Sequence, residues 1–141
     1  MAKGDKGSAT WEGSLKEGLG TMSTESGALS GQPYGFNTRF ESKPGTNPEE
    51  LIGAAFAGCF IMAMSKELEA EGLSDPEMDA TATVHLNQVD EGFRITKVEL
   101  DVTASVEGED AAFDRAVEAT KAGCPVANLL DTEIVYSVTR G

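Results

Sequence analysis

The fourteen residues from Leu51 to Met64 carry no charge and predict a buried helix. Asn47 and Pro48 are favoured residues for a helix cap and the first helical position, and Glu50 completes a capping-box pattern. The second half of the helix is polar, and Gly72 is expected to end it. About 25 residues give a length of about 36 Å. Because one sheet covers only one side of such a helix, its apolar surface requires further cover.

Alternation of apolar and polar residues predicts the strands. Residues 80–89 and 93–106 alternate on either side of an Asp-Glu-Gly turn, which predicts a hairpin of two long strands. Shorter alternating runs predict four further strands, at residues 8–15, 20–24, 36–41 and 132–139. Residues 26–35 are rich in Gly and Ser and are expected to form a loop.

A second helix is predicted at residues 110–122, because its apolar residues fall on one face and Gly123 follows. Pro125 would be the first residue of a short third helix, with Cys124 as its N-cap. Strand runs with inserted helices indicate an α+β fold with a largely antiparallel sheet. No repeat or dividing linker is evident, so residues 1–141 are expected to form a single domain, with residues 1–7 as a flexible tail.

The charge balance argues against two classes of partner. The formal net charge is −13 and the pI is about 4.3, so neither nucleic acid nor an anionic membrane is an expected partner. The apolar run of fourteen residues is shorter than the roughly 20 needed to span a bilayer. Since no apolar run follows the first lysines, a secretory signal is not expected, and we predict a cytoplasmic protein. In that compartment the two cysteines would be free thiols or a working redox pair.

Few residues suit metal or acid–base chemistry. His85 is the only histidine and lies in a predicted strand, opposite its apolar face, as a surface residue would. The cysteines are 65 residues apart, so the sequence has neither a CxxC motif nor zinc-knuckle spacing. No phosphate-binding glycine motif is present. We therefore expect no metal and no cofactor.

The two thiols are the strongest chemical candidates. Cys59 lies in the apolar helix, where a thiol can also pack as a small hydrophobe. Cys124 at a helix N-cap would meet unpaired N–H groups that favour the thiolate. Arg39 and Glu49 could activate a thiolate near Cys59, but a surface arginine and a first-turn carboxylate are equally ordinary. Glu49 and Cys59 are about 15 Å apart along one helix, so Glu49 would reach a thiol only if the chain folds back or a second copy supplies it.

Several motifs together resemble the OsmC/Ohr family, and the OsmC branch more than the organic hydroperoxide resistance branch. They cover nearly the whole chain. They are Trp11-Glu12-Gly13, residues 21–27, Pro33-Tyr34-Gly35-Phe36-Asn37-Thr38-Arg39-Phe40-Glu41, residues 45–55, Cys59, and Lys121-Ala122-Gly123-Cys124-Pro125-Val126.

The resemblance implies an OsmC-like fold, in which antiparallel sheets wrap around the long central cysteine-bearing helices of an intertwined homodimer. It implies a thiol peroxidase that reduces organic hydroperoxides in oxidative or osmotic stress. Cys59 would attack the peroxide, and Cys124 would resolve the sulfenic acid as an intrachain disulfide. Arg39 and Glu49 would hold the thiolate and substrate. A dithiol, such as a lipoylated protein, would then reduce the enzyme.

The apolar residues around Cys59 suggest a pocket for an alkyl peroxide, formed by Phe56, Phe60 and Met62, although all three suit a core. Phe56 and Gly58 replace a His and an Ala that the family resemblance leads us to expect. Two other functions remain open: a non-catalytic dimeric stress or ligand-binding protein with buried cysteines, and a thiol–disulfide exchange protein that does not react with peroxide.

Overall fold

The computed structural model describes residues 2–41 and 44–141. The chain divides into two compact units, Met1–Pro48 and Glu49–Gly141, which are described separately below. That the two units form a single domain stays a prediction.

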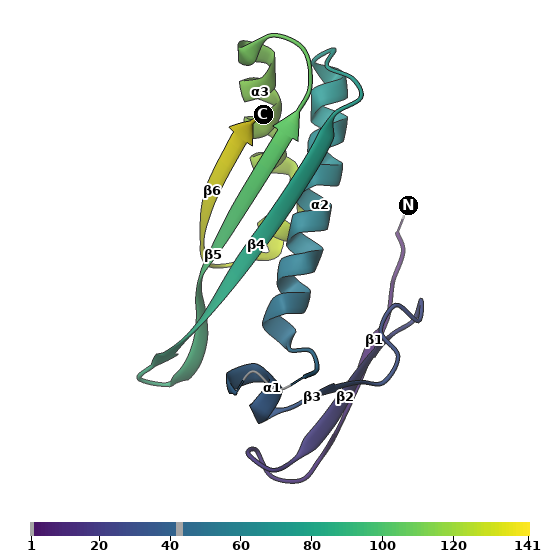
Figure 1. The fold of residues 1–141 in the computed structure, drawn as a ribbon, viewed down its shortest axis with the longest axis vertical. Helices are drawn as coiled ribbons and strands as arrows, with labels where there is room; N and C mark the ends of the chain where they lie inside the picture. The colour runs from purple at the N-terminus through teal and green to yellow at the C-terminus, as the bar shows by residue number, and fades with distance from the viewer. Residues whose placement is uncertain (1, 42–43) are drawn as a thin grey trace. The chain divides into compact units, whose positions relative to one another are not determined.

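The N-terminal unit is an antiparallel three-stranded sheet followed by a short helix (Figure 1). Its elements are β1 (Gly7–Glu12), β2 (Leu19–Thr24), β3 (Gln32–Tyr34) and α1 (Phe36–Phe40). The predicted pairing of the first two strands is confirmed, and Lys6, in the expected tail, already accepts a hydrogen bond from the Glu25 N–H. Gly20 permits close packing, since a Cβ there would lie 2.6 Å from the Thr10 carbonyl oxygen.

The predicted strand at residues 36–41 is wrong, because this segment is helix α1. Phe36 and Phe40 suit a strand face, but they are also one helical turn apart, and their ring centroids lie 4.8 Å apart. The Gly35 N–H donates to Thr38 Oγ1 over 2.8 Å, which caps the turn. The third strand is instead β3, inside the expected loop. It pairs with β2 and contains Pro33, which an edge strand tolerates.

The C-terminal unit places helices against a second three-stranded sheet. Its elements are α2 (Pro48–Ala70), β4 (Glu77–Val89), β5 (Gly92–Ser105), α3 (Asp110–Gly123), α4 (Pro125–Leu129) and β6 (Glu133–Arg140). The predicted hairpin is confirmed as the β4–β5 pair, and Gly72, with φ of +82°, follows the end of α2 as expected. β6 pairs with β5 in parallel, because α3 and α4 carry the chain back across the sheet. The sheets are otherwise antiparallel, as predicted.

One side of α2 forms the core. Phe56, Phe60, Met64 and Leu68 recur every fourth residue and are completely buried. They belong to one hydrophobic cluster with Val98, Leu100 and Val102 of β5 and with Phe113, Ala116 and Val117 of α3. By length and composition alone α2 could cross a membrane, but this buried face is that of a core helix.

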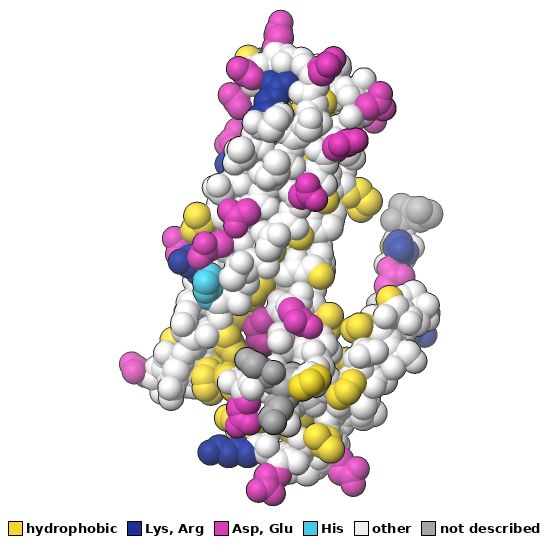
Figure 2. Space-filling view, viewed as in Figure 1, with side chains coloured by type: hydrophobic (Ala, Val, Ile, Leu, Met, Phe, Trp, Pro, Cys, Tyr) yellow, Lys and Arg dark blue, Asp and Glu magenta, His cyan; other side chains and the backbone are white. Residues whose placement is uncertain are grey.

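The opposite side of α2 is open within the single chain. Ala54, Ala55 and Gly58 are exposed, and Met62 is 71% exposed. The exposure of this side agrees with the expectation that the helix needs more cover than its own sheet provides. Elsewhere on the visible surface, carboxylates are scattered widely, consistent with the net charge of −13 (Figure 2).

Candidate functional site

The two cysteines meet beside the core of the C-terminal unit. Cys59 lies in the middle of α2, and Cys124 lies at the junction of α3 and α4. Cys124 Sγ donates to Cys59 Sγ over 3.6 Å. Cys124 is completely buried, whereas Cys59 is partly exposed. The pair therefore joins one partly exposed cysteine and one buried cysteine.

The backbone holds Cys124 from both sides. Its N–H donates to the Thr120 carbonyl of α3 over 2.9 Å, and its carbonyl accepts from the Asn128 N–H of α4 over 3.0 Å. Pro125 is the first residue of α4, so the prediction that Cys124 is an N-cap is confirmed. This junction fixes the position of the thiol relative to both helices.

The N–H groups at the cap favour the Cys124 thiolate in the direction expected, but burial of the sulfur opposes them. Burial raises the pKa of the Cys124 thiol, and the hydrogen bond to Cys59 acts in the same direction. The N–H groups of Ala127 and Val126 lower this pKa but do not outweigh burial. The Cys124 side chain makes no capping hydrogen bond. Cys124 is thus held as a neutral thiol.

Three aromatic rings pack together in the hydrophobic cluster that includes Cys124 and that Cys59 packs against. Phe56 and Phe60 lie one turn before Cys59 and directly after it, and both are completely buried. Their ring centroids lie 6.4 Å and 5.5 Å from that of Tyr136 on β6. Met62 points outward instead. The role of Phe56, Phe60 and Met62 as a substrate pocket stays a prediction.

Arg39 and Glu49 occupy different units. Arg39 is an exposed residue of α1 whose guanidinium lies 5.6 Å from the Phe40 ring centroid, over its face. It lines an apolar cavity of about 220 Å³ within the N-terminal unit, together with Trp11 and Tyr34. Glu49, in the first turn of α2, is only 8% exposed. Their action on the Cys59 thiolate stays a prediction.

Sequence reasoning assigned no role to Tyr136 or Lys121. Ile134, Tyr136 and Val138 alternate along the last strand, and this pattern predicts only that Tyr136 belongs to its apolar face. The signal in the sequence is the tyrosine hydroxyl, which needs a hydrogen-bond partner or water when the ring is buried. Lys121 Nζ lies 5.0 Å from the Tyr136 ring centroid, over its face. Burial raises the pKa of the Tyr136 hydroxyl, and the charge of a Cys124 thiolate raises it further.

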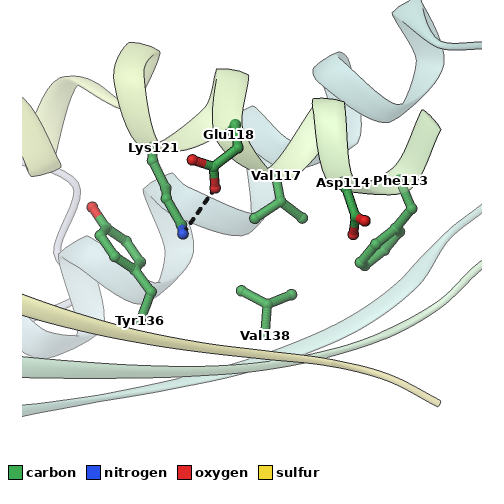
Figure 3. A pocket seen from close by; sticks show the side chains of 7 residues that line it. All are labelled: Phe113, Asp114, Val117, Glu118, Lys121, Tyr136 and Val138. Atoms are coloured by element: carbon green, nitrogen blue, oxygen red, sulfur yellow. Dashed lines mark ion pairs between the residues drawn. The ribbon is translucent and has the colours of Figure 1, made fainter. Parts of the chain in front are cut away.

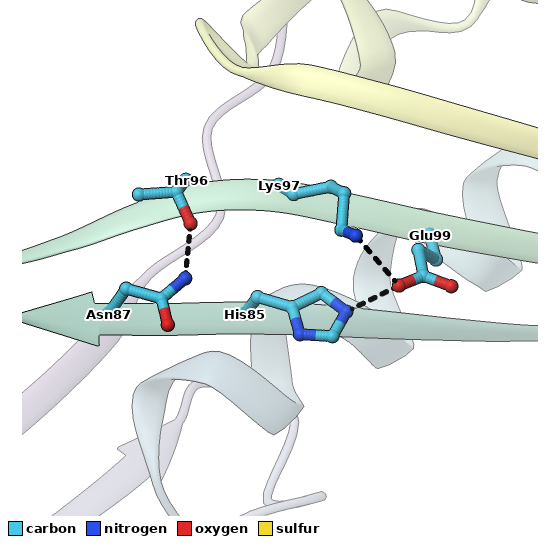
Figure 4. A network of polar contacts seen from close by, with 5 residues as sticks. All are labelled: His85, Asn87, Thr96, Lys97 and Glu99. Atoms are coloured by element: carbon cyan, nitrogen blue, oxygen red, sulfur yellow. Dashed lines mark hydrogen bonds and ion pairs between the residues drawn. The ribbon is translucent and has the colours of Figure 1, made fainter.

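His85 lies away from the cysteines in a polar network on β4 and β5 (Figure 4). Its Nε2 lies 2.8 Å from Glu99 Oε1, and Lys97 Nζ lies 3.3 Å from the same oxygen. Hydrogen bonds from Lys97 and then His85 lower the pKa of Glu99. The prediction of a surface strand position is confirmed. Among residues 2–41 and 44–141, no group of three or more His, Cys, Asp or Glu residues is arranged to hold a metal ion.

Known proteins match both the sequence and the fold. The family model described as OsmC-like protein matches residues 40–139. Peroxiredoxin OsmC of Escherichia coli is 56% identical over 130 residues, covering 92% of this chain and 91% of the relative. An organic hydroperoxide resistance protein of Xanthomonas axonopodis is 35% identical over 97 residues, covering 67% of this chain and 66% of the relative.

Solved structures agree on the fold. An OsmC-like protein from Vibrio cholerae has a TM-score of 0.74 at 17% identity, covering 97% of this chain and 99% of its own. The organic hydroperoxide resistance protein OhrB of Bacillus subtilis has a TM-score of 0.67 at 18% identity, covering 96% and 98%. The predicted α+β, OsmC-like fold is confirmed. The chain belongs to the OsmC-like protein family.

Proposed function

We propose that this chain is a peroxiredoxin-type enzyme that reduces organic hydroperoxides to alcohols through Cys59 and Cys124. Relatives named peroxiredoxin OsmC and organic hydroperoxide resistance protein support a peroxidase-type role. The observation that carries the two-cysteine mechanism is the 3.6 Å separation between the sulfurs of a partly exposed cysteine and a buried one. Such a pair suits a mechanism in which Cys59 reacts with the peroxide first and Cys124 then reacts with the oxidised Cys59.

In the first step the Cys59 thiolate attacks the outer oxygen of the hydroperoxide. The O–O bond breaks, the alkoxide leaves and takes a proton to become the alcohol, and Cys59 becomes a sulfenic acid. Before attack, the Cys124 thiol donates a hydrogen bond to Cys59 Sγ. Arg39 would stabilise the thiolate and the departing alkoxide through charge-assisted hydrogen bonds, and Glu49 would orient Arg39.

In the second step Cys124 attacks the sulfenic sulfur of Cys59. A disulfide forms, and the sulfenic oxygen leaves as water after taking up the proton that Cys124 releases. The sulfur atoms need to approach by about 1.5 Å to reach bonding distance. This step protects Cys59 from irreversible over-oxidation.

A dithiol reductant would restore both thiols and would itself become a disulfide. Cys59 is the entry point that suits this exchange, because it is the partly exposed cysteine of the pair. A lipoylated protein is the class of reductant that the family suggests. We further propose that the enzyme acts in the cytoplasm, in defence against oxidative or osmotic stress.

The substrate would be a peroxide with an alkyl or fatty-acid tail rather than hydrogen peroxide. Met62 is 71% exposed in the single chain, and it would contact such a tail at the edge of the dimer interface proposed below. Phe56 and Phe60 have no exposed surface, so they would shape the apolar floor beneath Cys59.

We also propose a homodimer in which a second copy covers the open side of α2. This side presents small or apolar residues, including Ala54, Ala55 and Met62, next to a buried core face. An exposed apolar helix face of this kind is typical of a protein interface.

A stoichiometric thiol assay tests the proposal. Reduced protein receives one equivalent of cumene hydroperoxide, and free thiols and cumyl alcohol are then counted. We expect one alcohol formed and two thiols lost per chain, with mass spectrometry locating a Cys59–Cys124 disulfide. Cys124→Ser should still form one alcohol and a sulfenic acid that dimedone traps, whereas Cys59→Ser should form neither.

The same assay separates the alternatives. Unchanged thiols and no alcohol would indicate a non-catalytic stress or ligand-binding protein. A disulfide formed with diamide, but none with peroxide, would indicate a thiol–disulfide exchange protein. Peroxide consumption by Cys59→Ser would overturn the assignment of the attacking residue.

A further inference from the structure

A pocket of about 260 Å³ lies between α3 and β6 in the C-terminal unit (Figure 3). Phe113 and Asp114 line one end, Val117 and Val138 face each other in the middle, and Lys121 and Tyr136 stand side by side at the other end. Glu118 holds Lys121 by an ion pair of 2.9 Å. The Lys121 end lies nearest to Cys124 along the chain, three residues before it.

Tyr136 contacts both helices that carry the reacting cysteines. On the α2 side its ring packs against Phe60 with an interplanar angle of 36° and meets Phe56 edge-on at 73°. On the α3 side its ring lies under Lys121 Nζ, 5.0 Å from the ring centroid. Tyr136 also packs against the buried cluster that includes Cys124. The ring therefore forms a bridge from the helix of Cys59 to the helix that ends at Cys124.

We propose that Tyr136 is a positioning residue for the resolving thiol, its ring holding the α3–α4 junction at the distance from which Cys124 reaches Cys59. The proposal rests on the two-cysteine function proposed above. Peroxide reduction at Cys59 does not need this bridge, whereas disulfide formation does, because the two sulfurs come from separate helices. Small displacements matter at this range, since a shift of about 1 Å in a reacting group slows a step by as much as about 10²-fold.

Tyr136→Leu removes the ring and keeps an apolar side chain. We expect its sulfenic acid formation to match wild type, while disulfide formation slows by about tenfold or more and peroxide-driven sulfinic acid accumulates at Cys59. Stopped-flow measurement of peroxide loss reports the first step. Quenched-flow alkylation with mass spectrometry reports the second. A merely structural defect would slow both steps or neither.

Three further variants sharpen the test. Tyr136→Phe keeps the ring and should form the Cys59–Cys124 disulfide at the wild-type rate. Equal slowing of this step in Tyr136→Phe and Tyr136→Leu would overturn a role for the ring. Lys121→Met removes the cation over the ring and should slow resolution by about threefold. Val138→Ala shortens a side chain on the same face of β6, two residues from Tyr136, and should leave the rate of disulfide formation unchanged.

A peroxide-free readout separates failure of this inference from failure of the proposed function. The effective concentration of the two thiols is obtained by equilibrating the Cys59–Cys124 pair against glutathione. We expect Tyr136→Leu to lower it by about tenfold, with Tyr136→Phe and Val138→Ala near wild type. An unchanged value in Tyr136→Leu would overturn the positioning role, even if wild-type protein consumed no peroxide.

Discussion

The Cys124 thiol donates a hydrogen bond to the Cys59 sulfur across 3.6 Å. The donor is the buried member of the pair and the acceptor is the partly exposed one. Burial keeps the proton on Cys124. The two cysteines thus differ before any substrate arrives, and this difference supports the proposed order, with Cys59 reacting first and Cys124 second.

The raised pKa of Cys124 predicts a loss of stability at alkaline pH. Below the ordinary thiol pKa of about 8.5, the folded and unfolded chains both keep this proton. Above it the unfolded chain releases the proton while the folded chain holds it, so stability falls as pH rises through the raised folded value. Denaturant unfolding of reduced protein between pH 7 and 10.5 should show this decline. Cys124→Ala should show a smaller decline; equal slopes for both proteins would contradict the burial argument.

Arg39→Lys should slow the oxidation of Cys59 by peroxide by about 10²-fold. Lysine keeps the charge but loses the planar fork of donors that would hold the thiolate and the departing alkoxide. Stopped-flow kinetics with cumene hydroperoxide measures this rate. Diamide-driven disulfide formation should slow much less, because it needs the thiolate but no alkoxide stabilisation. Arg115→Lys, in an exposed pair with Glu71, is the matched control. A normal peroxide rate in Arg39→Lys would remove Arg39 from the mechanism.

Met62→Glu should weaken self-association roughly tenfold or more, because it places a charge on the open side of α2 where a partner helix would desolvate it. Sedimentation velocity across a concentration series gives the dissociation constant. Glu69→Lys, near the polar end of the same helix, should leave association nearly unchanged. A wild-type protein that sediments as a monomer at every concentration would contradict the proposed dimer.

Arg140→Ala should lower the free energy of unfolding by about 2 kcal/mol. The Arg140 side chain is 22% exposed and donates to Asp110 Oδ1 over 2.6 Å. It also donates to the carbonyls of Val106 and Gly108 over 2.7 Å and 2.8 Å. The variant therefore releases the loop between β5 and α3. Urea unfolding measures the loss. Arg115→Ala removes an exposed ion pair and should lower the free energy of unfolding by less than about 1 kcal/mol. Equal losses in the two variants would show that the Arg140 contacts are no stronger than this exposed ion pair.

The elements with strong local signals were predictable. The start of α2 at Pro48, the alternation of the β4–β5 hairpin and the Gly-Cys-Pro junction after α3 each follow from residues that are close in the sequence. Residues 36–41 show the limit of such signals. Two phenylalanines four residues apart satisfy both a helix and a strand, and the Thr38–Gly35 hydrogen bond selects the helix.

The short strand β3 had no periodicity of its own, because it exists through pairing with β2. The pKa of Cys124 was also beyond local reasoning. A cap position alone favours a thiolate, and only the packing around the sulfur shows that burial prevails. Sequence pattern, in the same way, placed Tyr136 on the inner face of β6 but not between two helices.

The sequence by itself determined the helix of Cys59, the N-cap position of Cys124 and, through family motifs, the chemistry expected of both. Only the tertiary structure decided that sulfurs 65 residues apart lie 3.6 Å from each other, in one buried and one partly exposed cysteine. The physical reason is that caps and periodicities arise from neighbouring residues, whereas proximity and desolvation arise from the packing of α2 against the α3–α4 junction and the sheet.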